Sequence, residues 1–322
     1  MPGASESGNV VALAGGVGGA KLAQGLAGVV SGPNLSIVVN TADDFDLWGL
    51  HISPDLDTVM YTLAGIANPD TGWGIAGDTH HTLAGIAAYG EDPWFSLGDR
   101  DFATHILRAQ RLRQGTRLTT VTAELSKALG VEPCLLPMTD DPVATMIHTD
   151  GLVLAFQDYF VARRQQDNVD AVSFAGIDDA RPAPEVLAAI GEASTIVLCP
   201  SNPIVSIGPI LEIPGLRDAL LASDAAKIAV SPIVGGKALK GPADRMLASL
   251  GFESSALGIA RMYRDLIDVL VIDERDHELA DSIRALGVDV LVTQTVMGGR
   301  DDRQRLAAEV LACARETTRV AR

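Results

Sequence analysis

The sequence predicts an α/β protein built on a doubly wound, mostly parallel sheet. Short apolar runs without alternation recur along the chain, and such runs are typical of strands buried on both faces of a parallel sheet. Helical patterns such as 20–30 lie between most of them, and this alternation of strand and helix predicts a Rossmann-like architecture. The expected strands are 10–14, 35–39, 195–199, 227–230, 268–272 and 288–292.

The middle of the chain departs from this alternation. From about residue 55 to 130 helical patterns dominate, and residues 143–160 alternate around Asp150-Gly151, which is a strong hairpin signal. We therefore expect residues 10–322 to form a single α/β domain that follows a flexible tail at 1–9. A helical and hairpin lobe is expected to be inserted in this domain at about 55–165.

The composition limits the classes of partner. The 322 residues are 47% hydrophobic, which is enough for a large buried core. The 41 acidic residues outnumber the 25 basic ones and give a net charge of −16. Such a negative surface opposes contact with nucleic-acid phosphates and with anionic membranes, so neither partner is expected.

The sequence shows no targeting or disulfide pattern. The three cysteines are far apart without a Cys-x-x-Cys pair, so neither a disulfide framework nor a structural zinc site is predicted. No window of about 18 apolar residues occurs, and the first nine residues lack the features of a secretory signal. We therefore expect a cytoplasmic globular protein.

A glycine-rich stretch follows the first expected strand. The sequence "VVALAGGVGGAKLAQGL" is typical of a strand, a glycine loop and a helix whose first N–H groups attract anions. It is not a Walker A loop, because Lys21 is followed by Leu22 rather than by a hydroxyl residue. It also lacks the third glycine of the dinucleotide fingerprint. A phosphate-binding loop is predicted, with a tight turn that binds nothing as the alternative.

Five aspartates fall within fifteen residues after the second expected strand. Asp43 and Asp44 come directly after the strand, so they are expected at the carboxyl edge of the sheet, beside the glycine loop. Asp55 and Asp57 open a helix, where they could also be ordinary helix-dipole partners. Carboxylates this close repel one another unless a cation neutralises them. We predict that the cation is Mg²⁺, shared with a phosphate group of the substrate.

Further polar loops follow other expected strands. Ser201 and Asn202 come after the strand at 195–199, and Ser231 comes after the strand at 227–230. Because the carboxyl ends of parallel strands share one edge, these loops predict a cleft there. The histidines at 51, 80, 81 and 105 show no spacing that indicates a metal site.

Several stretches together resemble the 2-phospho-L-lactate transferase family, which makes the phosphodiester of the deazaflavin coenzyme F-420. They run in the family's order from about residue 10 to 320 and include "GGVGGAKLAQGL", "VVNTADD", "ISPDLDTVMYTL", "LGDRDFATHI", "LPMTDDPV" and "PSNPIVSIGPI". The resemblance implies a phosphotransferase that acts on the deazaflavin Fo. The donor would be a guanosine diphosphate ester of a phosphorylated hydroxy acid, and GMP would leave.

The resemblance also implies roles for particular residues. Asp43, Asp44 and Asp57 would hold Mg²⁺ or take the proton of the ribityl hydroxyl. Asp57 and Arg100 match the family's deazaflavin contacts. Asp57→Asn would then nearly abolish turnover and leave the fold intact. The residues expected to hold the guanosine diphosphate portion are Gly15, Gly16, Gly18, Gly19, Lys21, Ser201, Asn202 and Ser231.

The donor acid and two other functions stay open. Family members use phospholactate, phosphoenolpyruvate or phosphoglycerate, and the loops "ADDFDLWGLH" and "TVMGGRDD" depart from some relatives. A related family of nucleotide-sugar-binding regulatory proteins has a glycine/serine loop where this chain has extra carboxylates. An NAD-dependent dehydrogenase would need the missing third glycine. The resemblance also implies a homodimer.

Overall fold

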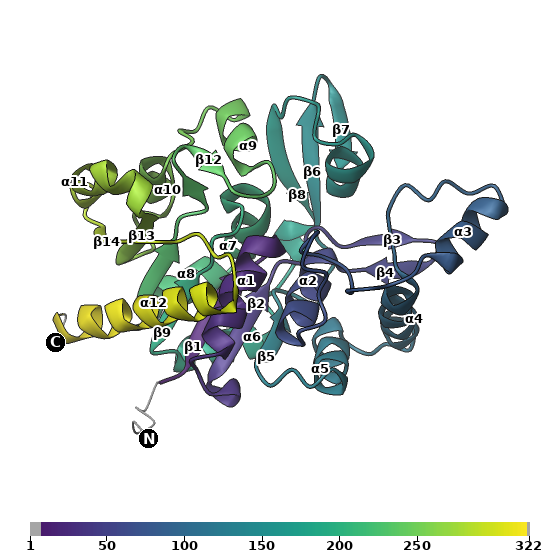
Figure 1. Ribbon diagram of the computed structural model, residues 1–322, viewed down its shortest axis with the longest axis horizontal. Helices are drawn as coiled ribbons and strands as arrows, with labels where there is room; N and C mark the ends of the chain where they lie inside the picture. The colour runs from purple at the N-terminus through teal and green to yellow at the C-terminus, as the bar shows by residue number, and fades with distance from the viewer. Residues whose placement is uncertain (1–7, 321–322) are drawn as a thin grey trace.

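A seven-stranded parallel sheet forms the centre of the computed structural model, which describes residues 8–320 (Figure 1). In spatial order its strands are β14 (Asp289–Thr293), β13 (Val269–Asp273), β10 (Ala226–Val230), β9 (Thr195–Leu198), β1 (Val10–Ala14), β2 (Leu35–Val39) and β5 (Cys134–Pro137). The predicted α/β class is confirmed. The tail expected at 1–9 lies, apart from its last two residues, outside the described residues.

The strand order reverses between β1 and β9. From β1 the chain proceeds through β2 to β5, whereas from β9 it proceeds through β10 and β13 to β14 on the other side. Val10 pairs with Leu35 of β2 and with Thr195 of β9, so β1 is hydrogen-bonded on both edges. Ligands of open α/β sheets bind outside the carboxyl ends of the strands at such a reversal.

Both faces of the sheet are covered by helices. Alternate residues of β1 enter two different cores: Val11 and Leu13 pack in one, Val10 and Ala12 in the other. The helices in the core of Val10 are α1 (Gly16–Ala27), α2 (Pro54–Leu63), α5 (Leu118–Ala128) and α12 (Arg300–Val320). Those in the core of Val11 are α6 (Pro184–Glu192), α7 (Gly208–Glu212), α8 (Leu216–Ala222), α9 (Ala243–Ser249), α10 (Ala256–Tyr263) and α11 (Ala280–Arg284).

One addition extends from the sheet beyond α2, at the right of Figure 1. It consists of a short hairpin of β3 (Phe45–Leu47) and β4 (Leu50–Ile52) with the helices α3 (His81–Ala88) and α4 (Asp99–Arg113). Its separate apolar core is built around Ile52, Leu97 and Phe102.

A second addition is an antiparallel sheet of β7 (Leu152–Ala155), β6 (Ala144–Thr149) and β8 (Ala171–Ala175). Asp150 and Gly151 join its first two strands with φ angles of 44° and 75°. Positive φ at both turn residues is the geometry of a two-residue hairpin, so the predicted hairpin is confirmed. A third, small hairpin joins β11 (Ile233–Val234) to β12 (Lys237–Ala238).

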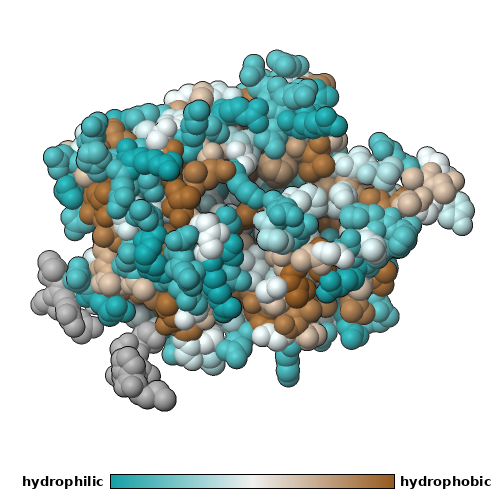
Figure 2. All heavy atoms as spheres, in the orientation of Figure 1, coloured by the Kyte–Doolittle hydropathy of each residue, from teal (hydrophilic) through white to brown (hydrophobic). Residues whose placement is uncertain are grey.

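The visible surface is mainly hydrophilic. Figure 2 shows hydrophilic residues over most of the visible face, with apolar residues in separate patches between them. None of the described helices has a stretch that is both long and apolar enough to cross a membrane.

Candidate active site

A cavity of about 810 Å³ opens at the carboxyl edge of the sheet, at the reversal of strand order. The loops after five strands line it, through Gly15 after β1, Asp43 after β2, Asn202 after β9, Ser231 after β10 and Thr295 after β14. This volume falls in the range of sites for small molecules and cofactors. The cleft expected from the strand-end loops is therefore present.

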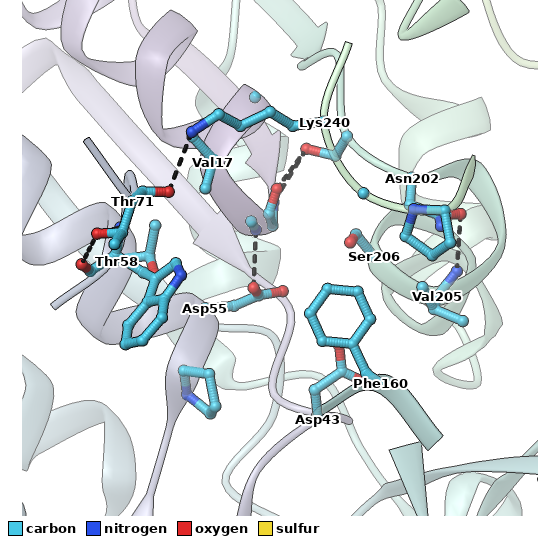
Figure 3. A pocket seen from close by; sticks show the side chains of 18 of the residues that line it. Val17, Asp43, Asp55, Thr58, Thr71, Phe160, Asn202, Val205, Ser206 and Lys240 are labelled. Atoms are coloured by element: carbon cyan, nitrogen blue, oxygen red, sulfur yellow. Dashed lines mark hydrogen bonds between the residues drawn. The ribbon is translucent and has the colours of Figure 1, made fainter. Parts of the chain in front are cut away.

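Aromatic side chains form part of the cavity wall. Phe156 and Phe160 stack with ring centroids 5.2 Å apart, and Trp94 meets Phe95 edge to face at 5.6 Å. Trp73 also lines the cavity. Figure 3 shows Phe160 close to Asp43. This wall could not be predicted from the sequence, because its residues lie in segments that come together only in the folded chain.

The glycine stretch is the beginning of α1 rather than a loop before a helix at 20–30. Gly15 is the N-cap of α1, and Gly16 is its first residue with a φ of +61°. The N–H of Gly15 donates to Ser201 Oγ at 3.1 Å, and the same hydroxyl donates to Gly15 O at 2.8 Å. Ser201 therefore fastens the loop after β9 to the loop after β1.

Two of the glycines are required by packing at this junction. A Cβ on Gly18 would lie 2.3 Å from Pro200 O, and a Cβ on Gly19 would lie 2.5 Å from Ser201 Oγ. The prediction took all four glycines as space for a ligand. At these two positions the space is filled by the neighbouring loop of the protein itself, and a Cβ on Gly15 would likewise lie 2.7 Å from Ser206 Cβ.

We expect Gly18→Ala to lower the free energy of unfolding by about 1–3 kcal/mol, because a backbone carbonyl must move to admit the methyl group. Urea denaturation measures this loss. The matched control is Gly85→Ala in α3, where nothing lies within 4 Å and the better helix propensity of alanine is expected to stabilise by about 0.5–1 kcal/mol. Equal effects of the two substitutions would contradict the packing argument.

Two buried carboxylates meet beside the start of α1. Asn40 Nδ2 donates to Asp43 Oδ2 at 3.2 Å and to Asp55 Oδ2 at 3.0 Å. Asp55 Oδ1 accepts the N–H of Gly16 at 2.7 Å, as Figure 3 shows. Asp43 Oδ1 is buried without a hydrogen-bond partner. The side chain of Asp55, which the sequence analysis left as a possible helix-dipole partner, thus contacts the glycine stretch directly.

This carboxylate pair favours binding of a proton or a cation. Burial, followed by the charge of Asp55, raises the pKa of Asp43 well above its usual value. Burial raises the pKa of Asp55 to about 6, against the opposing hydrogen bonds from Asn40 and Gly16. Neither carboxylate forms an ion pair with a basic residue of the described chain.

Asp44 belongs to a different network. Its Oδ2 accepts the hydroxyl of Ser53 at 2.7 Å and lies 3.1 Å from His51 Nε2. Burial raises the pKa of Asp44 against these contacts. Burial opposes the charged form of His51, but the hydrogen bond and charge of Asp44 outweigh it and raise the histidine pKa. Asp44 is not among the residues that line the cavity.

Asp57 lines the cavity but is already paired with a cation. Arg108 holds it in a two-pronged contact, in which Nη1 donates to Oδ2 at 3.0 Å and Nη2 donates to Oδ1. Both residues are buried, at 5% and 1% exposure. Arg108 Nη1 also lies 3.3 Å from His105 Nδ1, and Tyr61 donates to Asp101 at 2.7 Å.

Two clusters of acidic residues could be compared as Mg²⁺ sites: the Asp43–Asp55 pair, and the cluster around Asp57. Ligand atoms of Asp57, Asp101 and His105 lie within 4.8 Å of one another, and neither the spacing of His105 nor that of the other histidines had indicated a metal site. The guanidinium of Arg108 already neutralises Asp57, which leaves Asp101 as the one carboxylate of this group without an arginine or lysine partner among the described residues. Asp43 and Asp55 are two such carboxylates side by side, and they offer the oxygen atoms that Mg²⁺ prefers.

The remaining predicted residues lie in varied settings. Lys21 lines the cavity and donates to Met297 O at 3.1 Å. Asn202 Oδ1 accepts the N–H of Ile204 at 2.9 Å and caps the following turn, and Ser231 Oγ donates to Ile233 O at 2.9 Å. These two side chains line the cavity while they also shape its loops.

Arg100 lies outside the cavity lining. Its side chain is exposed on α4, and its Nη1 donates to Ala76 O at 3.3 Å. Its expected contact with a deazaflavin stays a prediction that this geometry does not support.

Comparisons with known proteins show which family this chain resembles. Residues 10–308 match the family model of the 2-phospho-L-lactate transferase CofD. A phosphoenolpyruvate transferase of Streptomyces coelicolor is 43% identical over 95% of this chain and 98% of its own. A 2-phospho-L-lactate transferase of Methanosarcina mazei is 38% identical over 94% of this chain and 99% of its own.

Solved structures agree at the level of the fold. A crystal structure of a UPF0052 family protein from Bacillus halodurans superposes with a TM-score of 0.63 and 17% identity, over 96% of this chain and 100% of that one. The family model and the curated relatives both cover nearly the whole chain. The protein therefore belongs to the CofD family of 2-phospho-L-lactate transferases.

Proposed function

We propose that this protein transfers a phospho-hydroxyacid group from its guanosine diphosphate ester to the ribityl hydroxyl of the deazaflavin Fo, in coenzyme F-420 biosynthesis. The hydroxyl oxygen bonds to the phosphorus that carries the acid, the diphosphate bond breaks, and GMP leaves. The observation that carries the proposal is the buried Asp43–Asp55 pair beside the start of α1, within the cavity of a CofD-family transferase.

Asp43 and Asp55 would hold Mg²⁺ together with phosphate oxygens of the donor. The bound ion would neutralise phosphate charge as the diphosphate bond breaks. Lys21 and the positive end of the α1 dipole add positive potential to the lining of the cavity. Positioning and charge neutralisation promote the transfer, the proton of the ribityl hydroxyl leaves to solvent, and no protein nucleophile is needed.

The aromatic wall suits the other substrate. A deazaflavin presents a flat ring system, and stacked or edge-on aromatic side chains bind such rings while they exclude water. Phe156 and Phe160 would contact that ring on the side of Asp43. This arrangement would bring the ribityl chain toward the carboxylate pair and hold the two substrates for reaction.

We further propose that the donor acid is phosphoenolpyruvate. The support is the higher identity to the Streptomyces coelicolor phosphoenolpyruvate transferase, 43%, than to the Methanosarcina mazei 2-phospho-L-lactate transferase, 38%. The homodimer implied by the resemblance stays a prediction.

The test is a mass-spectrometric assay with purified protein, Mg²⁺, Fo and each of the three guanylylated donor acids. We expect the phosphodiester of Fo and an equal amount of GMP, most with the phosphoenolpyruvyl donor, and no product in EDTA. Binding of Fo or of a nucleotide without product from any donor would instead support a binding protein.

The raised pKa of Asp55 predicts a pH dependence of stability in metal-free buffer. Its folded-state pKa of about 6 lies above the ordinary 3.8, so its protonated form is favoured in the folded protein. The resulting stability is complete below pH 3.8 and is lost as pH rises through 6, by about 3 kcal/mol in all.

Urea denaturation in EDTA between pH 4 and 7.5 measures this loss, with Asp55→Asn as the reference that lacks the titrating group. We expect the stability of the wild type to fall relative to the variant as pH rises, and excess Mg²⁺ to restore it at pH 7.5. If the free energies of unfolding of the two proteins changed with pH in parallel, burial would not raise the pKa of Asp55.

A further inference from the structure

A second, smaller cavity adjoins the main one. It has a volume of about 210 Å³, and Val17, Lys21 and Lys240 line both cavities. Gln24, Asn68 and Arg303 are among its other lining residues. It lies where α1, the segment after α2, the loop after β12 and the first turn of α12 meet.

Three basic side chains converge on this small cavity without an acidic partner. Lys21 comes from α1, Lys240 from the loop after β12, and Arg303 from the first turn of α12. The residues that line it include neither aspartate nor glutamate. None of the three cations is in an ion pair with a described residue, although the chain has 41 acidic residues for 25 basic ones.

The contacts of these cations hold them in place without neutralising them. Lys21 Nζ donates to Met297 O at 3.1 Å, and Lys240 Nζ donates to Thr71 O at 3.0 Å, as Figure 3 shows for Lys240. Arg303 Nη1 donates to the side chain of Gln24, and Arg303 Nε is buried without a partner. Carbonyl and amide oxygens fix the direction of each group but carry no net charge.

The cluster is electrostatically unfavourable when nothing else is bound. Burial, followed by repulsion from Arg303 and Lys240, lowers the pKa of Lys21. Burial also lowers the pKa of Arg303. An anion in this cavity would relieve the repulsion and provide an acceptor for the free Nε–H of Arg303.

We propose that the small cavity is an oxyanion subsite, which takes a phosphate or carboxylate group of a ligand whose remainder lies in the main cavity. The inference rests on the proposed function, because the donor ester carries both groups: phosphates on the nucleotide and a carboxylate on the acid. Arg303, Lys240 and Lys21 would bind the anion together. Val17, Lys21 and Lys240 line both cavities, so the two cavities lie next to each other and one ligand could contact both.

The test measures binding rather than turnover, on the full chain with inorganic phosphate as the first probe. We expect phosphate to raise the melting temperature of the wild type, and this rise to shrink in Arg303→Gln and in Lys240→Gln. Arg315→Gln, exposed later on α12, and Lys237→Gln, exposed in β12, make the same charge change away from the cluster and are expected to keep it.

Two calorimetric titrations, one with GDP and one with the guanylylated donor, then show whether a nucleotide phosphate or the carboxylate of the acid occupies the subsite. A nucleotide phosphate in the subsite predicts that GDP binds about 10–100-fold more weakly to Arg303→Gln than to Arg315→Gln. If the carboxylate of the acid occupies the subsite, Arg303→Gln and Arg315→Gln bind GDP with equal affinity. Only the guanylylated donor then binds about 10–100-fold more weakly to Arg303→Gln. Should Arg303→Gln not fold, Lys240→Gln gives the same comparison against Lys237→Gln.

The proposal is overturned if phosphate, GDP and donor all bind the cluster variants as they bind the controls. It stands, while the proposed function falls, if the cluster variants lose anion binding but the wild type makes no phosphodiester from any donor. The two ideas can therefore fail separately.

Discussion

Asp43→Asn is expected to lower kcat/KM by roughly 10³-fold and to abolish the thermal stabilisation by Mg²⁺. The substitution keeps the shape of the side chain but removes one of the two charges that would hold the ion. In EDTA at pH 7.5 the variant is expected to be at least as stable as the wild type, because it no longer buries a carboxylate of raised pKa beside Asp55. Steady-state kinetics and thermal unfolding, each with EDTA and with excess Mg²⁺, measure these effects.

The matched control is Asp46→Asn. Asp46 lies in β3, three residues after Asp43. Its side chain is 80% exposed, and it is not among the residues that line the cavity. The control is expected to retain activity and the response to Mg²⁺. If Asp43→Asn kept near-native turnover and still gained stability from Mg²⁺, the carboxylate pair would not be the metal site.

The central sheet could be predicted because buried parallel strands leave a strong mark in the sequence. The run 10–14 is apolar throughout, and those at 35–39 and 227–230 hold only one polar residue each, since both faces of these strands are covered. β5 was missed, because it is four residues long and ends in Pro137. A proline cannot donate to a strand pairing and is confined to edges, and β5 is indeed the edge strand.

The hairpin of β3 and β4 could not be predicted from its turn. Its two turn residues are Trp48 and Gly49, with φ angles of 51° and 73°. Such turns normally carry asparagine or aspartate at the first position, because a bulky residue rarely adopts positive φ. The surrounding aspartates gave the stretch the appearance of an irregular loop.

The place of the candidate site at the edge of the sheet could be predicted, but the contacts among its charged residues could not. The strand pattern placed Asp43 and the glycine stretch at one edge of the sheet, and the structure has both in the cavity lining. Which aspartates face one another depends on how the start of α2 approaches α1. That approach brings Asp55 to Gly16 and leaves Asp57 facing Arg108, a residue that the sequence did not single out.

Arg108→Met is expected to lower the free energy of unfolding by about 3–5 kcal/mol, because it leaves the carboxylate of Asp57 buried without its cation. Asp57→Asn alone is expected to destabilise as well, since it leaves a buried guanidinium without a counter-charge. This expectation replaces the earlier one that Asp57→Asn leaves the fold intact. Urea denaturation of both single variants in excess Mg²⁺ gives the two losses.

The double variant decides whether the pair acts as a unit. With both charges removed, no uncompensated charge stays buried, so the combined loss is expected to be smaller than the sum of the single losses by several kcal/mol. Simple addition of the two losses would mean that solvent or a neighbour such as His105 compensates each charge on its own. The double variant also tests the role of Asp57 toward the substrate. If it folds well and fails to bind Fo while Arg108→Met still binds it, the carboxylate itself contacts the deazaflavin. Normal binding of Fo by the double variant assigns Asp57 to holding the wall of the cavity.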